Sequence, residues 1–154
     1  DAAVTAYAID QLWVPAYEGG NADHDVTNAI SSLFAKRLGV LEFAEYNFAN
    51  QQTNSHAFPH PNGTEQTINL TPVEEERKRK ALATYVSEQQ NLNYVELRRE
   101  CYRPLAAHDY RRAPHEGTLW YARFQWVPFR HPRVDFTNPN IISDNITTFL
   151  SSRG

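Results

Sequence analysis

The residues best suited to chemistry lie in one short stretch, residues 17–25. The stretch reads Tyr17-Glu18-Gly19-Gly20-Asn21-Ala22-Asp23-His24-Asp25. A neutral imidazole binds divalent metals, and carboxylates beside it can orient a metal ligand or move a proton. The density of acid, amide and imidazole groups is higher than a simple connector needs. A solvated loop with an aspartate at a helix start and an incidental histidine explains the same residues equally well.

Elements on both sides would hold this stretch in place. The apolar run Leu12-Trp13-Val14 is typical of a short buried strand. A helical stripe follows, with apolar side chains at Val26, Ala29, Ile30, Leu33 and Phe34. Asp23 or Asp25 can cap that helix, and Gly39 suits its end. Because α/β proteins often place ligand sites in the loop between the end of a strand and the start of a helix, the stretch is a candidate site.

The rest of the chain alternates strand and helix patterns. Helices are expected in residues 1–10, from Thr71, in 94–102 and from Asn138. Strands are expected in residues 40–48 and 120–129, with a polar loop over 50–63. This alternation predicts an α/β chain with a mainly parallel sheet.

Further polar groups accompany the expected strands. Glu42 and Glu45 interrupt the 40–48 strand; one of them could face a site, but edge or rim positions are the more ordinary interpretation. Arg130 and His131 follow the 120–129 strand, where their donors suit sugar hydroxyls or a phosphate. The remaining histidines show no metal-ligand spacing and are interpreted as loop residues; they are His56, His60, His108 and His115.

The expected 120–129 strand alternates aromatic and polar side chains. Trp120, Ala122, Phe124 and Trp126 would share one face. Packing in a core is the first interpretation of that face. An aromatic platform that stacks against a sugar ring is the second.

Composition limits the function classes. The chain has 154 residues and a net charge of -3, which gives no basic field for nucleic acid. Its apolar runs are too short for a membrane span. The single Cys101 excludes an internal disulfide and fits a reducing, cytoplasmic compartment. With one cysteine, a zinc site would have to use histidine and carboxylate ligands.

The stretch at 17–25 resembles the second motif of the LmbE-like, or PIG-L, zinc de-N-acetylase family, which reads Glu-Gly-Gly-His-Pro-Asp-His-Asp. The resemblance implies that His24 is a zinc ligand and that Asp23 belongs to the hydrogen-bonded shell of the site. Asn21 stands where the family has a histidine that holds the developing oxyanion. Tyr17 and Glu18 lie where the family's turn approaches the substrate, although Glu18 could instead bind the backbone amides of the glycine turn.

Two later segments add to the resemblance. Residues 70–89 are similar to the charged helix and the Tyr, Ser-Gln segment that follow the zinc motif, with Glu88 interrupting the Ser-Gln pair. Glu100-Cys101-Tyr102-Arg103 resembles the family's Glu-x-Phe/Tyr-Arg element. The family's earlier motif, Ala-His-Pro-Asp-Asp-Glu, does not occur in the chain. We therefore expect residues 1–154 to be a single domain that forms the C-terminal part of a larger, Rossmann-like deacetylase domain.

The resemblance implies a zinc-dependent hydrolase that removes an N-acetyl group from an N-acetylglucosamine-type or similar amide substrate. The other zinc ligands and the general base would come from an N-terminal segment of the same protein, and an oligomer is compatible with the sequence. The expected catalytic residues are Asn21 and Asp23, with substrate contacts from Tyr17, Glu18, Arg130 and His131. A non-catalytic sugar-binding or interaction protein on the same fold is the alternative, and a generic α/β domain with a chance motif match is a third.

Overall fold

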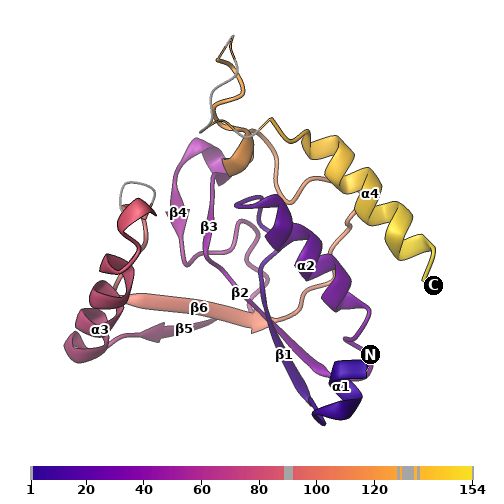
Figure 1. The fold of residues 1–154 in the computed structure, drawn as a ribbon, viewed down its shortest axis with the longest axis horizontal. Helices are drawn as coiled ribbons and strands as arrows, with labels where there is room; N and C mark the ends of the chain where they lie inside the picture. The colour runs from indigo at the N-terminus through magenta and orange to yellow at the C-terminus, as the bar shows by residue number, and fades with distance from the viewer. Residues whose placement is uncertain (1, 89–91, 128, 130–133, 135, 154) are drawn as a thin grey trace.

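A four-stranded sheet lies at the centre of the molecule, and helices α2 and α4 pack against each other beside it (Figure 1). The computed structural model describes residues 2–88, 92–127, 129, 134 and 136–153. The strands of this sheet are β1 (Gln11–Pro15), β2 (Gly39–Phe43), β5 (Gln66–Asn69) and β6 (Arg99–Pro104). Their order across the sheet is β1-β2-β6-β5.

The expected α/β class is confirmed, but the described sheet is mixed. β1 and β2 pair in parallel, with Val14 opposite Glu42. β6 pairs antiparallel to both of its neighbours, β2 and β5. The parallel pair exists because α2 (Ala22–Ser32) returns the chain from the end of β1 to the start of β2. The carboxyl ends of β1 and β2 therefore meet at one edge of the sheet.

The remaining elements are short and surround the sheet. β3 (Tyr46–Asn47) and β4 (Asn54–Ser55) form a separate two-stranded pair. The other helices are α1 (Ala2–Ala6), α3 (Pro72–Ala83) and α4 (Pro139–Ser151). Three-residue 3₁₀ helices occur at η1 (Ala49–Gln51), η2 (Val86–Glu88) and η3 (Trp120–Ala122). In the part of the chain that is described, no helix has the length and apolar character needed to cross a membrane.

Local capping signals are confirmed where they were expected. Thr71 caps α3, and the Glu74 carboxylate accepts a hydrogen bond from the Thr71 backbone N–H at 2.8 Å, completing a capping box. Asn138 caps α4, as expected from the helix predicted to start at this residue. The cap of α2 differs from expectation: Asn21 accepts from the backbone N–H of Asp23 at 2.8 Å, so neither aspartate is the cap.

Two expected elements are wrong. The helix expected over residues 94–102 is absent: residues 94–98 form a turn and bends, and residues 99–102 belong to strand β6, whose backbone hydrogen-bonds to β2 on one side and β5 on the other. The strand expected over residues 120–129 is η3 followed by turns through residue 126. The N–H of Trp120, the first residue of η3, donates to the Gly19 carbonyl at 2.9 Å, and this bond ties the segment to the glycine turn.

Among the described residues, eight of the thirteen buried hydrophobic residues form two small separate groups. Ala16, Ala44, Phe58 and Cys101 make one group, which confirms that Cys101 is buried. Tyr17, Ala29, Tyr110 and Ile146 make the other. The two groups flank the end of β1, since Ala16 and Tyr17 are consecutive. This neighbourhood is also where the glycine turn begins.

Candidate functional site

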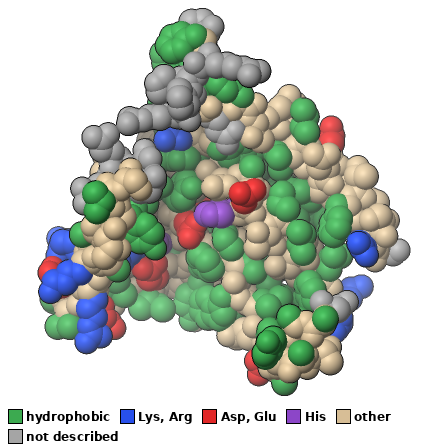
Figure 2. Space-filling view, in the orientation of Figure 1, with side chains coloured by type: hydrophobic (Ala, Val, Ile, Leu, Met, Phe, Trp, Pro, Cys, Tyr) green, Lys and Arg blue, Asp and Glu red, His purple; other side chains and the backbone are tan. Residues whose placement is uncertain are grey.

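His24 lies in the first turn of α2, close to the carboxyl edge of the parallel strand pair. Its Nδ1 is 2.9 Å from Oε2 of Glu45, an ion-pair distance without the geometry of a hydrogen bond, and its side chain is 27% exposed. The close contact with Glu45 raises the pKa of His24, burial opposes that rise, and the negative charges of Glu45, Asp25 and Asp23 add to it. The imidazole therefore occupies an electronegative position with part of its ring open to solvent. Figure 2 shows a histidine with acidic side chains beside it near the middle of the displayed face.

The glycine turn that precedes α2 is held by the buried carboxylate of Asp25. Its Oδ1 accepts hydrogen bonds from the backbone N–H groups of Glu18 and Gly19, each at 3.1 Å. Burial raises the pKa of Asp25 to about 7, against the effect of these hydrogen bonds. Gly19 has a φ of +70°, and a Cβ on Gly20 would collide with the backbone oxygen of Tyr46. Both glycines are therefore required for the chain to pass through this turn.

Glu18 is fully enclosed and holds the segment that carries Glu45. Its carboxylate accepts from the backbone N–H groups of Glu45 at 2.7 Å and Tyr46 at 3.0 Å, and from the Asn47 amide at 3.1 Å. Burial raises the pKa of Glu18 to about 8. The structure thus gives Glu18 a positioning role with 1% of its surface exposed. The amides of the glycine turn, which we considered for Glu18, are bound by Asp25 instead.

The other expected site residues are placed in different ways. Asn21 and Asp23 lie beside His24 on the first turn of α2, with Asn21 acting as the cap. Tyr17 is buried, and its hydroxyl donates to the Arg112 carbonyl at 2.6 Å. Its ring meets Tyr110 edge-on at 4.9 Å. Arg130 and His131 lie outside the described residues.

Aromatic rings gather next to His24. The ring of Tyr46 lies 6.2 Å from the His24 imidazole, 5.4 Å from Trp120 and 5.2 Å from Tyr94. The Arg123 guanidinium stacks on the Trp120 ring at 3.8 Å. Of the expected aromatic face, Trp120 takes part directly and Phe124 contacts the same Arg123 guanidinium at 4.5 Å, whereas Trp126 is 77% exposed. The rings of Tyr46, Tyr94 and Trp120 are inclined to one another by 57–66°, so they form a tilted cluster beside His24 that is built from three separate segments.

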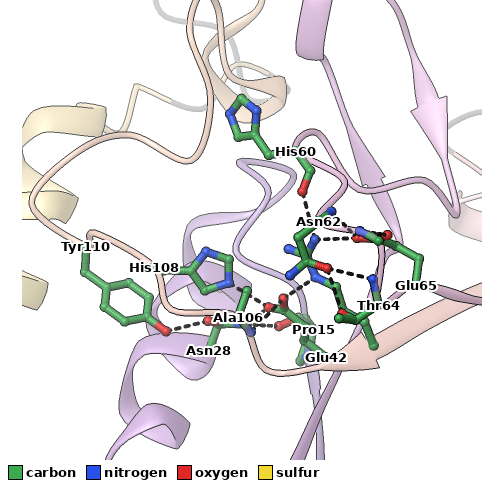
Figure 3. A network of polar contacts seen from close by, with 12 residues as sticks. Pro15, Asn28, Glu42, His60, Asn62, Thr64, Glu65, Ala106, His108 and Tyr110 are labelled. Atoms are coloured by element: carbon green, nitrogen blue, oxygen red, sulfur yellow. Dashed lines mark hydrogen bonds and ion pairs between the residues drawn. The ribbon is translucent and has the colours of Figure 1, made fainter.

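A second polar centre forms around Glu42, on the α2 side of the sheet (Figure 3). Its buried carboxylate accepts from Asn28 at 2.9 Å, from Arg103 Nε at 2.7 Å and from the backbone N–H of Ala106 at 3.3 Å. Arg103 and Ala106 bind Oε1, whereas His108 Nε2 lies 2.8 Å from Oε2, the oxygen that Asn28 also binds. The rim position expected for Glu42 is therefore wrong, because none of its surface is exposed.

The partners of Glu42 keep it ionised in this buried position. Burial alone raises the pKa of Glu42, but the hydrogen bond and charge of His108 and the hydrogen bonds from Arg103 and Asn28 bring it below its ordinary value. Arg103 is itself shared with Glu65 at 2.8 Å. One guanidinium therefore pairs with two carboxylates, the fully buried Glu42 and the 18% exposed Glu65. Because the polar groups of this centre are already bonded to one another, we assign the centre a structural role.

Sequence reasoning missed most of these partners. Glu45 was one of two carboxylates left open as site residues, and it does contact His24. A charged residue within an apolar strand run was the available signal for Glu42. Arg103 was noted only as the end of the Glu-x-Phe/Tyr-Arg resemblance, and nothing indicated that it or His108 would bind Glu42, since they are 61 and 66 residues away along the chain.

Comparison with known proteins adds no relative: no family model, curated protein or solved structure matches the chain. The likeness to LmbE-like deacetylases rests on the motif residues and their surroundings. Within the described ranges, no three His, Cys, Asp or Glu side chains are grouped so that they could hold a metal ion. His24 fits a metal ligand as a single residue, with a carboxylate behind one ring nitrogen.

Proposed function

We propose that this chain is the later part of a zinc-dependent hydrolase that removes an N-acetyl group from an N-acetylglucosamine-type or similar amide substrate. The observation that carries the proposal is the contact of His24 Nδ1 with Glu45 at 2.9 Å. Histidines that bind metals usually have their second ring nitrogen held by a carboxylate or carbonyl oxygen. This contact leaves Nε2 of His24 as the nitrogen for a metal.

The electrostatic surroundings of His24 support a cation there. Asp23, Asp25 and Glu45 all act on the imidazole in the direction that favours positive charge. Zinc accepts histidine and carboxylate ligands, so His24 would provide one of them. In this proposal the other ligands and the general base belong to a segment outside these residues, and the sheet is the later half of a Rossmann-like fold.

Bound zinc would act as a Lewis acid toward an amide carbonyl and lower the pKa of water. The chain's own residues would position that chemistry. Glu45 orients the His24 ring, and Glu18 and Asp25 fix the backbone on either side of it. Asn21 uses its side-chain oxygen as the helix cap, so its amide N–H groups can donate to an oxyanion.

The substrate class is supported by the aromatic rings next to His24. Tyr46, Tyr94 and Trp120 contact one another with centroid distances between 4.6 and 5.4 Å. Aromatic rings with a polar tip offer both an apolar surface and a hydrogen-bonding group. A sugar ring has an apolar C–H face and polar edges and could pack on one ring of this tilted cluster, which favours an amino sugar over a simple acetamide.

The test is zinc analysis and deacetylation by the full-length protein. We expect about one zinc per chain and release of acetate from N-acetylglucosamine or a related amide. His24→Ala should lose both the metal and the activity, because one ligand of zinc is removed. Thr27→Ala, on an exposed position of the same helix, is the matched control and should retain both. Full zinc occupancy in His24→Ala would overturn the proposal.

Asn21 offers a second test of the same proposal. Asn21→His restores a group that titrates near neutral pH, whereas asparagine does not titrate. We expect the pH–rate profile of this variant to gain an ionisation that the wild-type profile lacks. An unchanged profile would show that position 21 has no part in the reaction.

A non-catalytic sugar-binding protein is the second candidate, and the aromatic rings beside His24 favour it as well. The two candidates differ in their need for metal. Sugar binding that survives a chelator, without acetate release by the full-length protein, would select the second.

A further inference from the structure

Helix α3 is attached to the rest of the molecule mainly by polar contacts. None of its side chains, which all lie in the described part of the chain, is buried. Glu75, Lys78 and Leu82 are half-buried and form its inward face, and the helix lies at the end of the sheet where β6 begins (Figure 1). Glu75 is 4.0 Å from the largely exposed Arg98, which is a weak contact. Because α3 has no buried apolar stripe, its docking depends on Lys78.

Lys78 contacts three groups of the body at short distances. Its ammonium group donates to the Glu96 carbonyl at 2.7 Å and lies 2.7 Å from Oε1 of Glu100 in β6. Its Nζ is also 2.9 Å from Nε2 of His56. An ammonium group has three N–H donors and no acceptor, so Nε2 of His56 must accept the hydrogen bond in this contact.

His56 belongs to a polar loop of the sequence, but its side chain is buried. Its Nδ1 is 3.0 Å from the Ala44 carbonyl oxygen and 3.0 Å from Oε2 of Glu100, and both oxygens are acceptors. The single ring proton of the neutral imidazole is therefore on Nδ1, and the lone pair of Nε2 faces Lys78. The backbone of His56 has a φ of +50°, in the left-handed region, and its N–H donates to the Glu45 carbonyl at 3.1 Å. A strained residue of this kind persists where the surrounding structure holds it in place.

A second proton on His56 would abolish its contact with α3. This proton would go to Nε2, which would then direct an N–H at the Lys78 ammonium group 2.9 Å away, with two positive charges side by side. Burial has the largest effect on the pKa of His56 and lowers it, as does the Lys78 cation, whereas the carboxylates of Glu100 and Glu45 raise it. The Arg99 guanidinium, 3.3 Å from the carbonyl oxygen of the preceding residue, is a further cation close to His56. The net result is a pKa below the ordinary 6.5 while α3 is docked.

The contacts of Lys78 also hold the segment that carries Tyr94. The carbonyl of Glu96 accepts from Lys78, and its N–H donates to the Ser55 hydroxyl at 3.0 Å. This segment and Glu75 of α3 line a cleft of about 530 Å³, and Tyr94 is part of its wall. Movement of α3 would therefore open this cleft and remove one support of Tyr94.

We propose that α3 is a pH-operated flap, which stays docked while neutral His56 accepts the hydrogen bond of Lys78 and is released, together with the segment that carries Tyr94, when His56 is protonated. The released state binds the proton more tightly than the docked state does. The docked state is therefore complete above pH 6.5 and is lost progressively as the pH falls below 6.5. The proposal uses neither His24 nor a metal, so it holds whether or not the chain belongs to a hydrolase.

Hydrogen–deuterium exchange of the full-length protein at about pH 7.5 and about pH 5.5 tests this flap, with rates corrected for the intrinsic effect of pH. We expect the protection of the backbone amides in residues 72–83 and 94–98 to fall at least about threefold at the lower pH. The amides of α4 are the internal reference, because α4 lies far from α3 (Figure 1). An equal loss of protection in α4, or an unchanged α3, overturns the proposal.

Two variants separate His56 from the other groups that titrate in this range. His56→Gln offers Lys78 an amide oxygen that does not titrate, so the loss of protection at the lower pH should disappear. His60→Gln, an exposed change in the same loop, is the matched control and should keep the wild-type response. A wild-type response in His56→Gln contradicts the assignment.

Lys78→Met is the second variant, and it decides the question even where the buried His56→Gln change prevents folding. It removes the cation that faces Nε2, so α3 should be less protected at both pH values and should no longer respond to pH. Lys80→Met, at a 76% exposed position of the same helix, is the matched control. Equal protection of α3 in the two variants, or a wild-type pH response in Lys78→Met, overturns the proposal.

Discussion

Glu18 and Glu42 are both fully buried carboxylates, yet their surroundings move their pKa values in opposite directions. Glu18 accepts three N–H groups but has no positive partner, so burial dominates and raises its pKa to about 8. Glu42 has the Arg103 guanidinium at 2.7 Å, and its pKa is lowered. The two residues therefore respond to pH with opposite signs.

Glu18 should make the folded state less stable as pH rises. Its folded pKa of about 8 is above the ordinary 4.5, so its contribution is complete below pH 4.5 and is lost as pH rises through 8. One such group gives a slope of at most about 1.4 kcal/mol per pH unit. When the pH is raised from 5 to 8, we expect the free energy of unfolding to fall less in Glu18→Gln than in the wild type. Urea unfolding at four pH values measures this, and parallel curves would contradict it.

Glu42→Gln should strongly destabilise the fold. The change takes from the Arg103 guanidinium its fully buried carboxylate partner and leaves it with Glu65 and the His60 carbonyl; breaking a buried ion pair costs about 3 kcal/mol. Glu76→Gln is the control, because Glu76 forms a surface pair with Arg79 and should change stability by less than about 0.5 kcal/mol. Urea unfolding at pH 7 compares the two. Similar losses in both variants would contradict a central role for Glu42.

At the scale of elements, the glycine turn connects β1 to α2 and fixes where His24 emerges. Asp25 binds the backbone of the turn from the helix side, and Glu18 binds the 45–46 backbone from the strand side. The N–H of Trp120 donates to the Gly19 carbonyl and so attaches a third segment of the chain to the turn. His24 is therefore positioned by contacts that reach three separate parts of the chain.

Gly20→Ala should disrupt this turn. Its Cβ would meet the backbone oxygen of Tyr46, which cannot move aside as a flexible side chain does. Overpacking of this kind costs about 1–3 kcal/mol. Gly39→Ala is the matched control, since the nearest atom to its added Cβ is 3.8 Å away, and it should change stability by less than about 0.5 kcal/mol. Equal unfolding midpoints for the two variants would show that the turn tolerates a side chain.

Elements with local signals were predicted well from the sequence, and elements set by distant partners were not. The capping box of α3 needs only Thr71 and Glu74, three residues apart, so it is visible in the sequence. β6 is a strand because two other strands flank it, which no local pattern in Arg99–Pro104 reveals. The site follows the same rule: His24 stood out by its motif, whereas the contacts of Arg103 and His108 with Glu42 join distant residues and had no local signal.

The whole molecule has a divided and shallow core. Its two buried apolar groups contain four residues each, and both include alanine. Among the described residues, fourteen large hydrophobic side chains are exposed, compared with thirteen buried hydrophobic residues. Figure 2 shows such side chains spread over the displayed face. Stability contributed by burial is therefore small for a chain of 154 residues.

We expect the isolated chain to unfold with low cooperativity. Two small groups of buried side chains give little enthalpy per residue, so the thermal transition should be broad, and the native state should bind a hydrophobic dye. Differential scanning calorimetry tests this by comparing calorimetric and van't Hoff enthalpies. A single sharp transition with equal enthalpies and no dye binding would contradict the expectation.

The carboxylate of Glu42 also has a consequence for how the chain folds. Its partners are 14, 61, 64 and 66 residues away, so no fragment of the chain forms this centre alone. Contacts between residues so far apart require the closure of long loops and form slowly. The helices can appear early, but the interior joining α2 to β6 must be assembled late. During that interval an ionised group and its guanidinium remain in water, and the nascent protein is most open to proteases and to aggregation.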